Sequence, residues 1–115
     1  MDILKIAIPL ADGRLTAHFG HCQSFAVYTV NTAEKKILSR EDLTPPPHEP
    51  GLFPKWVAEL KVGLVIAGGM GTRAQDLFLS FGVAVLTGAP CLDPDEVVRR
   101  HMAETLSTGD NACDH

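Results

Sequence analysis

Two histidines, a cysteine and an arginine lie close together near the start of the chain, in a stretch from residue 13 to residue 22 that contains no acidic residue. The side chains concerned are Arg14, His18, His21 and Cys22. Imidazole nitrogen and thiolate sulfur are ligands that suit zinc, copper and iron, and a guanidinium group attracts anions. The stretch therefore predicts a site for a metal or for an anion that contains one.

The spacing His18-x-x-His21-Cys22 leaves three interpretations open. A closed zinc site needs four ligands, usually from two clusters, and the second cluster would be Cys113 with His115. In the second interpretation, both imidazoles only make hydrogen bonds within the loop, and the thiol packs as a small hydrophobic group. In the third, which we favour, these side chains hold a metal-containing anion more loosely.

Length and composition indicate one globular domain. The chain has 115 residues, of which 45% are hydrophobic and 21% charged, and a chain of this size can bury a core without disulfides. Its net charge is −4 and its ten lysine and arginine residues are scattered, whereas nucleic-acid binding requires a clustered basic surface. The longest apolar stretch, 62–67, is far too short to cross a bilayer. We expect a protein that binds neither nucleic acid nor membranes.

The cysteines indicate the cellular compartment. There are three of them, an odd number, and the chain opens without the basic and apolar regions of a signal peptide. Free thiols are typical of the reducing cytoplasm. We therefore expect a cytoplasmic protein without a disulfide.

Hydrophobic periodicity predicts an α/β fold with five strands and three helices, in the order βββαβαβα. The strands are expected at 3–10, 24–30, 35–41, 63–67 and 83–87, and the helices from about Pro54, from Thr72 and after Asp93. Turns join the first three strands and helices join the later ones, so the sheet should be mixed and covered by helices on both faces. Residues 1–106 form this single domain, and 107–115 are expected to be a flexible tail.

Short signals mark the ends of the predicted helices. Thr72 and Gln75 match a capping box that opens the second helix, and Gly82 is expected to end it. Asp93 should cap the third helix, whose inward face would carry 97, 98 and 102.

A glycine-rich loop, 68–71, follows the fourth strand and precedes a helix. If the first and fourth strands are parallel neighbours, the loops after them lie side by side. The second loop would then contribute backbone N–H groups, Arg73 and the positive end of a helix. Met70 would be either a soft sulfur contact or a hydrophobic plug, and Gly71 is expected to need a positive φ. A compact anion with metal or sulfur character could bind between the two cationic loops.

The same loop also matches a different motif. Gly69-x-Gly71-x-x-Ala74 fits the dinucleotide fingerprint between a strand and a helix, which favours a small nucleotide-dependent or redox enzyme as the alternative. The acidic residue expected near the end of the next strand is missing, because Thr87 and Gly88 stand there. A purely structural interpretation, in which the glycines only permit a tight turn and close helix packing, stays open as well.

Three motifs, in this order along the chain, resemble the dinitrogenase iron-molybdenum cofactor biosynthesis family. They are the Lys-Ile-Ala-Ile-Pro run at 5–9, the His-Phe-Gly run at 18–20, and the Val-Gly-Leu-Val-Ile-Ala-Gly-Gly-Met-Gly run at 62–71. The resemblance covers nearly the whole chain and is strongest to small stand-alone members. It implies a ribonuclease H-like fold and a non-catalytic protein that binds, stores or delivers a metal-sulfur cluster. The cluster would contain molybdenum, as an iron-molybdenum precursor or a molybdenum-copper sulfide.

The resemblance carries over by position to 18–20 and 68–71, and the loop chemistry adds the other residues of the expected site. The residues expected to bind the cluster are Arg14, His18, Phe19, Gly20, Gly68, Gly69, Met70, Gly71, Thr72 and Arg73, and the expected metal ligands are His21 and Cys22. Contacts from cations and backbone amides could act beside ligation by the thiol or replace it. The cluster itself and a client or cluster-donor protein are the expected partners, and no catalytic residue is expected.

Overall fold

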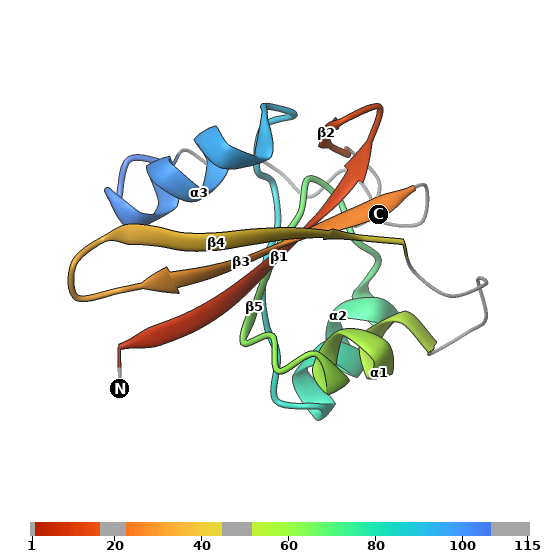
Figure 1. The fold of residues 1–115 in the computed structure, drawn as a ribbon. Helices are drawn as coiled ribbons and strands as arrows, with labels where there is room; N and C mark the ends of the chain where they lie inside the picture. Colours follow the sequence, from red (N-terminus) through yellow and green to blue (C-terminus); the bar gives the residue numbers. More distant parts are fainter. Residues whose placement is uncertain (1, 17–22, 45–51, 107–115) are drawn as a thin grey trace.

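The computed structural model describes residues 2–16, 23–44 and 52–106 as a mixed sheet with helices on both faces (Figure 1). Its elements are β1 (Ile3–Ala11), β2 (Arg14–Leu15), β3 (Ser24–Asn31), β4 (Lys36–Leu43), α1 (Leu52–Glu59), β5 (Leu64–Ile66), α2 (Thr72–Ser80), β6 (Ala84–Leu86) and α3 (Pro94–Met102). The strand order is β4-β3-β1-β5-β6, and β2 pairs with β1. The predicted α/β class and mixed sheet are confirmed. The expected tail at 107–115 lies outside the described residues.

The prediction of five strands was wrong by one, because β2 was taken as part of a loop. Asp12 and Gly13 both have positive φ, 55° and 79°, and they form a two-residue turn that pairs Leu10 with Leu15. Two positive φ values are what this kind of hairpin turn requires, and Asp-Gly is among the sequences that favour it. The turn folds β2 back onto the carboxyl end of β1.

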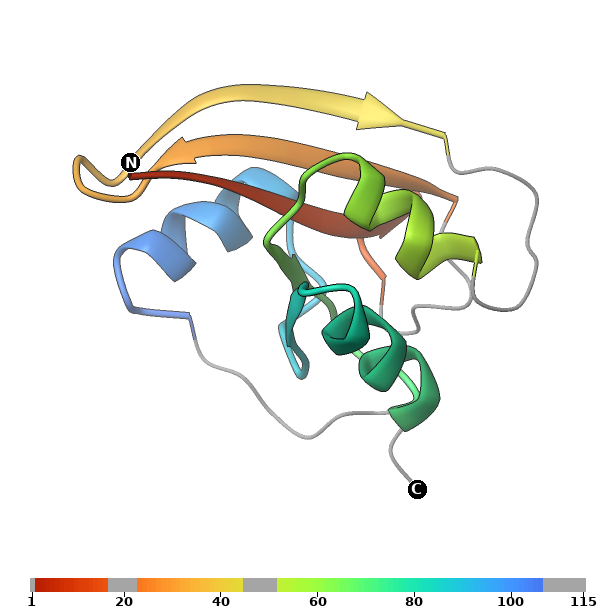
Figure 2. The same cartoon turned by 90° about the horizontal axis from the view of Figure 1, so that it is seen from below.

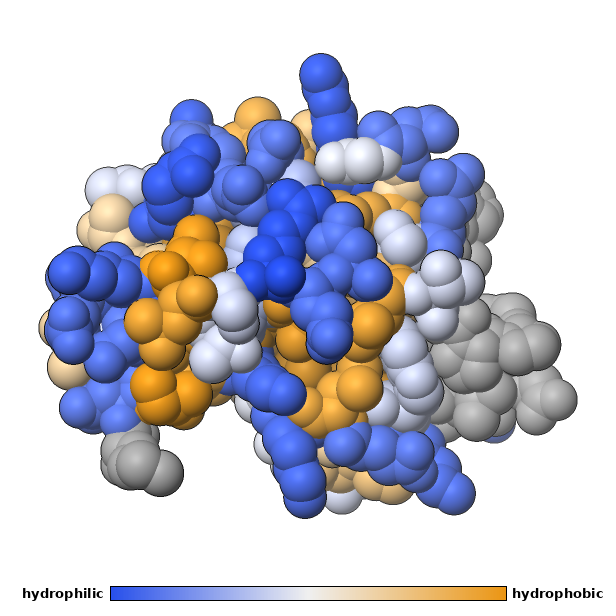
Figure 3. Space-filling model, in the orientation of Figure 1, coloured by the Kyte–Doolittle hydropathy of each residue, from blue (hydrophilic) through white to orange (hydrophobic). Residues whose placement is uncertain are grey.

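β1 is buried on both faces because it lies in the middle of the sheet. Ile6 and Ile8 point into the core shared with α3, while Ala7 faces the core shared with α1 and α2. Figures 1 and 2 show α3 on one face and the other two helices on the opposite one. The edge strand β4 is mostly exposed. On the face shown in Figure 3, hydrophilic side chains surround patches of hydrophobic ones.

The ends of α2 and α3 test the predicted caps. Asp93 caps α3, since its carboxylate accepts a hydrogen bond of 2.9 Å from the backbone N–H of Asp95. Gly82, with φ of 81°, follows the end of α2, and its N–H donates to the carbonyl of Leu79 at 3.0 Å. Both predictions are confirmed.

None of the described helices is long and apolar enough to span a bilayer.

The capping box predicted at the start of α2 was wrong. The N-cap is Gly71, which has no side chain to offer, and Thr72 is already helical. The side-chain amide of Gln75 donates to the carbonyl of Met70 at 2.8 Å, so its bond is to a carbonyl and not to the N–H group that a capping box uses. The backbone N–H groups at this helix end therefore lack the side-chain cap that was expected.

Candidate functional site

β1 and β5 are parallel neighbours, so the loops that follow them begin at the same edge of the sheet. Ile6 pairs with Leu64 and Ala7 with Val65. β6 runs parallel to β5 as well, on its other side, and its carboxyl end reaches the same edge. The parallel pairing on which the sequence prediction depended is confirmed, and Figure 1 shows β1 and β5 in the middle of the sheet.

The first loop begins with the β1–β2 hairpin, where Arg14 is exposed and Leu15 is buried. The N–H of Thr16 donates to the carbonyl of Pro9 at 3.0 Å, and the N–H of Gln23 donates to the carbonyl of Leu10 at 2.7 Å. Thr16 and Gln23 are therefore both held at the carboxyl end of β1. The expected site residues His18, Phe19, Gly20, His21 and Cys22 lie between these points, outside the described residues, and their roles stay predictions.

The second loop runs from β5 into α2 and contains both buried and exposed site residues. Gly68 and Gly69 are buried, and Met70 is fully buried within the core shared with α1 and α2. Met70 therefore packs as the hydrophobic plug that the sequence allowed. A contact between its sulfur and a cluster stays a prediction. Thr72 and Arg73 are exposed, so they are the side chains that the second loop presents to solvent.

Gly71 has an ordinary backbone conformation, contrary to the expectation of a positive φ. Its φ is −62° and its ψ is 151°, values open to any residue. A Cβ atom built there meets nothing within 4 Å. The first turn of α2 carries no acidic residue, so the positive end of the helix is not neutralised within its own first turn.

The sequence did not predict a third loop, residues 87–93, which joins β6 to α3. The N–H of Gly88 donates to the carbonyl of Gly68 at 2.6 Å, and the N–H of Leu15 donates to the carbonyl of Leu92 at 3.1 Å. The loop is thus bonded to the glycine loop on one side and to the β1–β2 hairpin on the other. It carries the exposed free thiol of Cys91, which the sequence had marked only as a free cysteine. The predicted strand order could have indicated this loop as part of the site, because β6 is parallel to β5 and ends at the same edge of the sheet.

The described part of the site carries two exposed arginines, Arg14 and Arg73, together with Asp12 in the β1–β2 turn and Asp93, whose carboxylate caps α3. Among the described residues, no salt bridge engages Arg14 or Arg73. Within the same residues, no group of three His, Cys, Asp or Glu side chains could hold a metal ion. The two guanidinium groups and the N-terminus of α2 can attract an anion, and Cys91 can present one thiol to it.

Comparison with known proteins finds a sequence relative and solved structures of similar fold. It is 26% identical over 88 residues to the uncharacterized protein MJ0580 of Methanocaldococcus jannaschii, covering 74% of this chain and 75% of that one. The crystal structure of PH0822 has a TM-score of 0.84 at 24% identity and covers 91% of this chain and 94% of its own. The apo orange protein from Desulfovibrio gigas has a TM-score of 0.70 at 20% identity and covers 93% of both chains.

The two solved structures, which this chain covers almost completely, confirm the expected fold. The sequence itself matches the model of the dinitrogenase iron-molybdenum cofactor family over residues 2–104, nearly the whole chain. The match includes all three loops at the carboxyl edge of the sheet. The protein therefore belongs to the dinitrogenase iron-molybdenum cofactor family.

Proposed function

We propose that this protein binds a metal-sulfur cluster as cargo and carries it to a client protein, without catalysing a reaction. The observation that carries the proposal is the parallel pairing of β1 with β5, which brings the hairpin of Arg14 and the N-terminus of α2 to one edge of the sheet. Membership of the iron-molybdenum cofactor family supports a cluster as the ligand. We place this activity in the cytoplasm, where thiols stay reduced.

The described residues suit an anionic cargo. Metal-sulfur clusters rich in sulfide carry net negative charge, and Arg14 and Arg73 can each donate charge-assisted hydrogen bonds to it. The backbone N–H groups at the start of α2 add further donors and the positive end of the helix dipole. Because exposed charge interactions are screened by salt, such a site binds reversibly, and a carrier must release its cargo.

Soft ligands can add to this electrostatic holding. Cys91 presents an exposed thiol on the third loop, and His21 and Cys22 are the donors predicted from the sequence. We propose a molybdenum-containing cargo, either an iron-molybdenum precursor or a molybdenum-copper sulfide. Thiolate sulfur is a ligand that copper and iron accept.

Uptake of a defined cluster tests the proposal. The purified protein is incubated with tetrathiomolybdate and copper, or with an iron-molybdenum precursor, and then desalted. We expect visible charge-transfer absorption to stay with the protein. Its complete loss on desalting, together with thermal stabilisation by NAD or ATP, would instead favour the nucleotide-dependent alternative for the glycine loop.

Single variants separate electrostatic holding from ligation by Cys22. Arg14→Ala and Arg73→Ala should each weaken binding by about 1–2 kcal/mol, a 5- to 30-fold loss, and should reduce its dependence on salt. Arg99→Ala, which removes an exposed arginine from α3, is the matched control and should bind normally. If Cys22→Ser abolishes binding while both loop arginine variants bind normally, the electrostatic mechanism is wrong.

A further inference from the structure

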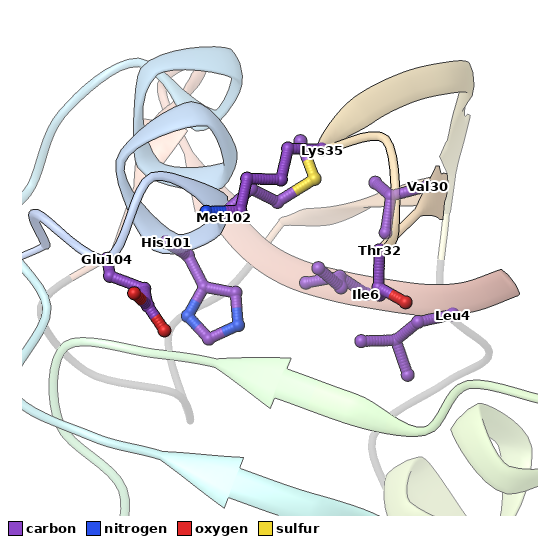
Figure 4. Close-up of a pocket in the computed structure, with 8 residues that line it drawn as sticks. All are labelled: Leu4, Ile6, Val30, Thr32, Lys35, His101, Met102 and Glu104. Carbon is purple, nitrogen blue, oxygen red and sulfur yellow. The ribbon is translucent and has the colours of Figure 1, made fainter. Parts of the chain in front are cut away.

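A cavity of about 250 Å³ lies between the sheet and the C-terminal end of α3, at the end of β1 opposite the candidate cluster site (Figure 4). The cavity is smaller than the roughly 300–1,000 Å³ of pockets that hold drug-sized ligands. It therefore suits a small metabolite. None of the residues assigned to the cluster site lines it.

The lining of this cavity divides into an apolar floor and a polar rim. The floor is made by Leu4, Ile6, Val30 and Met102, of which Ile6 and Val30 are fully buried. The rim is made by Thr32, Lys35, His101 and Glu104. In Figure 4, His101 and Glu104 lie together on one side, and Thr32 lies across the cavity from them. A ligand that fits this lining has an apolar body and a polar head.

The rim carries charges of both signs, which restricts the head group. A simple carboxylate would meet the repulsion of Glu104, and a simple amine would meet that of Lys35. A zwitterion can place an opposite charge near each of them. The cavity is thus complementary to a head group that contains both an ammonium and a carboxylate.

Lys35 and Glu104 also stand where glycine would be more stable. Their φ values are 55° and 60°, in the left-handed region that side chains disfavour. Lys35 lies in the turn between β3 and β4, and Glu104 follows the end of α3. Four residues other than glycine have positive φ in the described part of the chain, and two of them line this cavity. A charged side chain at such a position costs stability that glycine would not, which motivates the hypothesis that the charges of Lys35 and Glu104 have a role.

We propose that this cavity binds a free α-amino acid with an aliphatic or thioether side chain. The side chain rests on the apolar floor, the ammonium faces Glu104, and the carboxylate faces Lys35. His101 closes the cavity beside Glu104 and offers ring nitrogen atoms to the ligand. This binding is separate from cluster binding, since the two sites share no residue.

Calorimetric titration of the purified protein with L-leucine and L-methionine tests the ligand class. We expect dissociation constants of about 0.1–1 mM, the range open to a ligand of so few atoms. 4-Methylpentanoate lacks the ammonium, isopentylamine lacks the carboxylate and glycine lacks the apolar body. Each should bind at least tenfold more weakly than leucine. Equal binding of leucine and any of these three, or no binding of leucine, would overturn the proposal.

Glycine variants separate ligand binding from folding. Lys35→Gly and Glu104→Gly should each raise the melting temperature by about 3–6 °C, because they relieve the positive φ, and should weaken leucine binding at least fivefold. Lys36→Gln and Glu59→Gln remove the same charges from exposed positions outside the cavity and should bind leucine normally. Stabilised glycine variants that still bind leucine with the native affinity would show that the rim charges do not recognise a ligand.

Discussion

Replacing Gly71 with aspartate should strengthen the fold and weaken cluster binding at the same time. Gly71 is the N-cap of α2, its φ of −62° is open to any residue, and no side chain caps this helix end. A Cβ atom would meet nothing within 4 Å. The substitution therefore adds a carboxylate to the candidate site without straining the backbone.

The expected gain in stability combines three small effects. An aspartate N-cap is better than glycine by a few tenths of a kcal/mol, and loss of glycine restricts the unfolded chain by about 0.4–1 kcal/mol. A negative charge near the helix N-terminus adds about 0.3–1 kcal/mol. These effects are only partly additive, so we expect the free energy of unfolding to rise by about 1 kcal/mol and the melting temperature by roughly 3–6 °C.

The expected loss in binding comes from repulsion between the new carboxylate and an anionic cluster. At roughly 6 Å and an effective dielectric constant between about 20 and 80, each pair of like unit charges costs about 0.7–3 kcal/mol. This corresponds to a loss of affinity of about 3- to 100-fold for each unit of cluster charge. The carboxylate would also occupy N–H groups at the start of α2 that the cluster would otherwise use.

Urea denaturation and titration with a preformed cluster at low salt measure the two effects separately. Gly71→Asn is the matched control, because asparagine caps the helix equally well without a charge. It should be stabilised similarly and should lose less affinity. A more stable Gly71→Asp protein with native affinity would remove the second loop from the site, and a destabilised one would refute the N-cap assignment.

Three further predictions concern the framework and the third loop. Tyr28→Phe should lower the free energy of unfolding by about 1–2 kcal/mol at pH 7, because the Tyr28 hydroxyl donates a hydrogen bond to the carboxylate of Asp95. That bond lowers the pKa of Asp95 in the folded protein, so the difference between variant and wild type should shrink as Asp95 becomes protonated in acid. Urea titrations from pH 7 down to the acid limit of the folded state measure it, and a difference that stays constant over that range would contradict this. Gly82→Ala should cost about 1 kcal/mol in urea denaturation, because φ is 81° there, and an unchanged midpoint would count against the turn. Cys91 is exposed and should react with a thiol reagent without denaturant, which the Cys91→Ser protein would verify; labelling of Cys91 only after unfolding would refute its exposure.

The sequence predicted those elements whose signals are local. The apolar run of β1, the alternation in β3 and the glycine after α2 each act through neighbouring residues, and the structure has all three features. The start of α2 was mispredicted because Thr72 and Gln75 fit the capping-box pattern, in which the threonine is the N-cap. The extended backbone of Gly71 places the cap one residue earlier. The Asp12–Gly13 turn was a local signal that was overlooked.

The candidate site could be predicted only as far as strand direction allows. The right-handed crossover rule places β5 parallel to its neighbour, and this was sufficient to bring the first two loops together. The third loop is held by hydrogen bonds between Leu15 and Leu92 and between Gly68 and Gly88. These pairs are distant in sequence and use backbone groups, which every residue carries, so residue types gave no indication of them.

That same use of backbone bonds decides how side-chain variants of the site should behave. Main-chain hydrogen bonds join the third loop to each of the other two and the first loop to β1. The side chains of Arg14, Arg73 and Cys91 are exposed and take no part in the core. Truncating one of these side chains removes its charge or its thiol and leaves the framework in place. The acidic side chains at the start of α3 have partners of their own: Asp93 caps the helix, Arg40 binds Asp95 at 2.9 Å, and Arg100 binds Glu96 at 2.8 Å. A change in cluster affinity in these variants can therefore be assigned to the side chain that was removed, and not to a rearranged site.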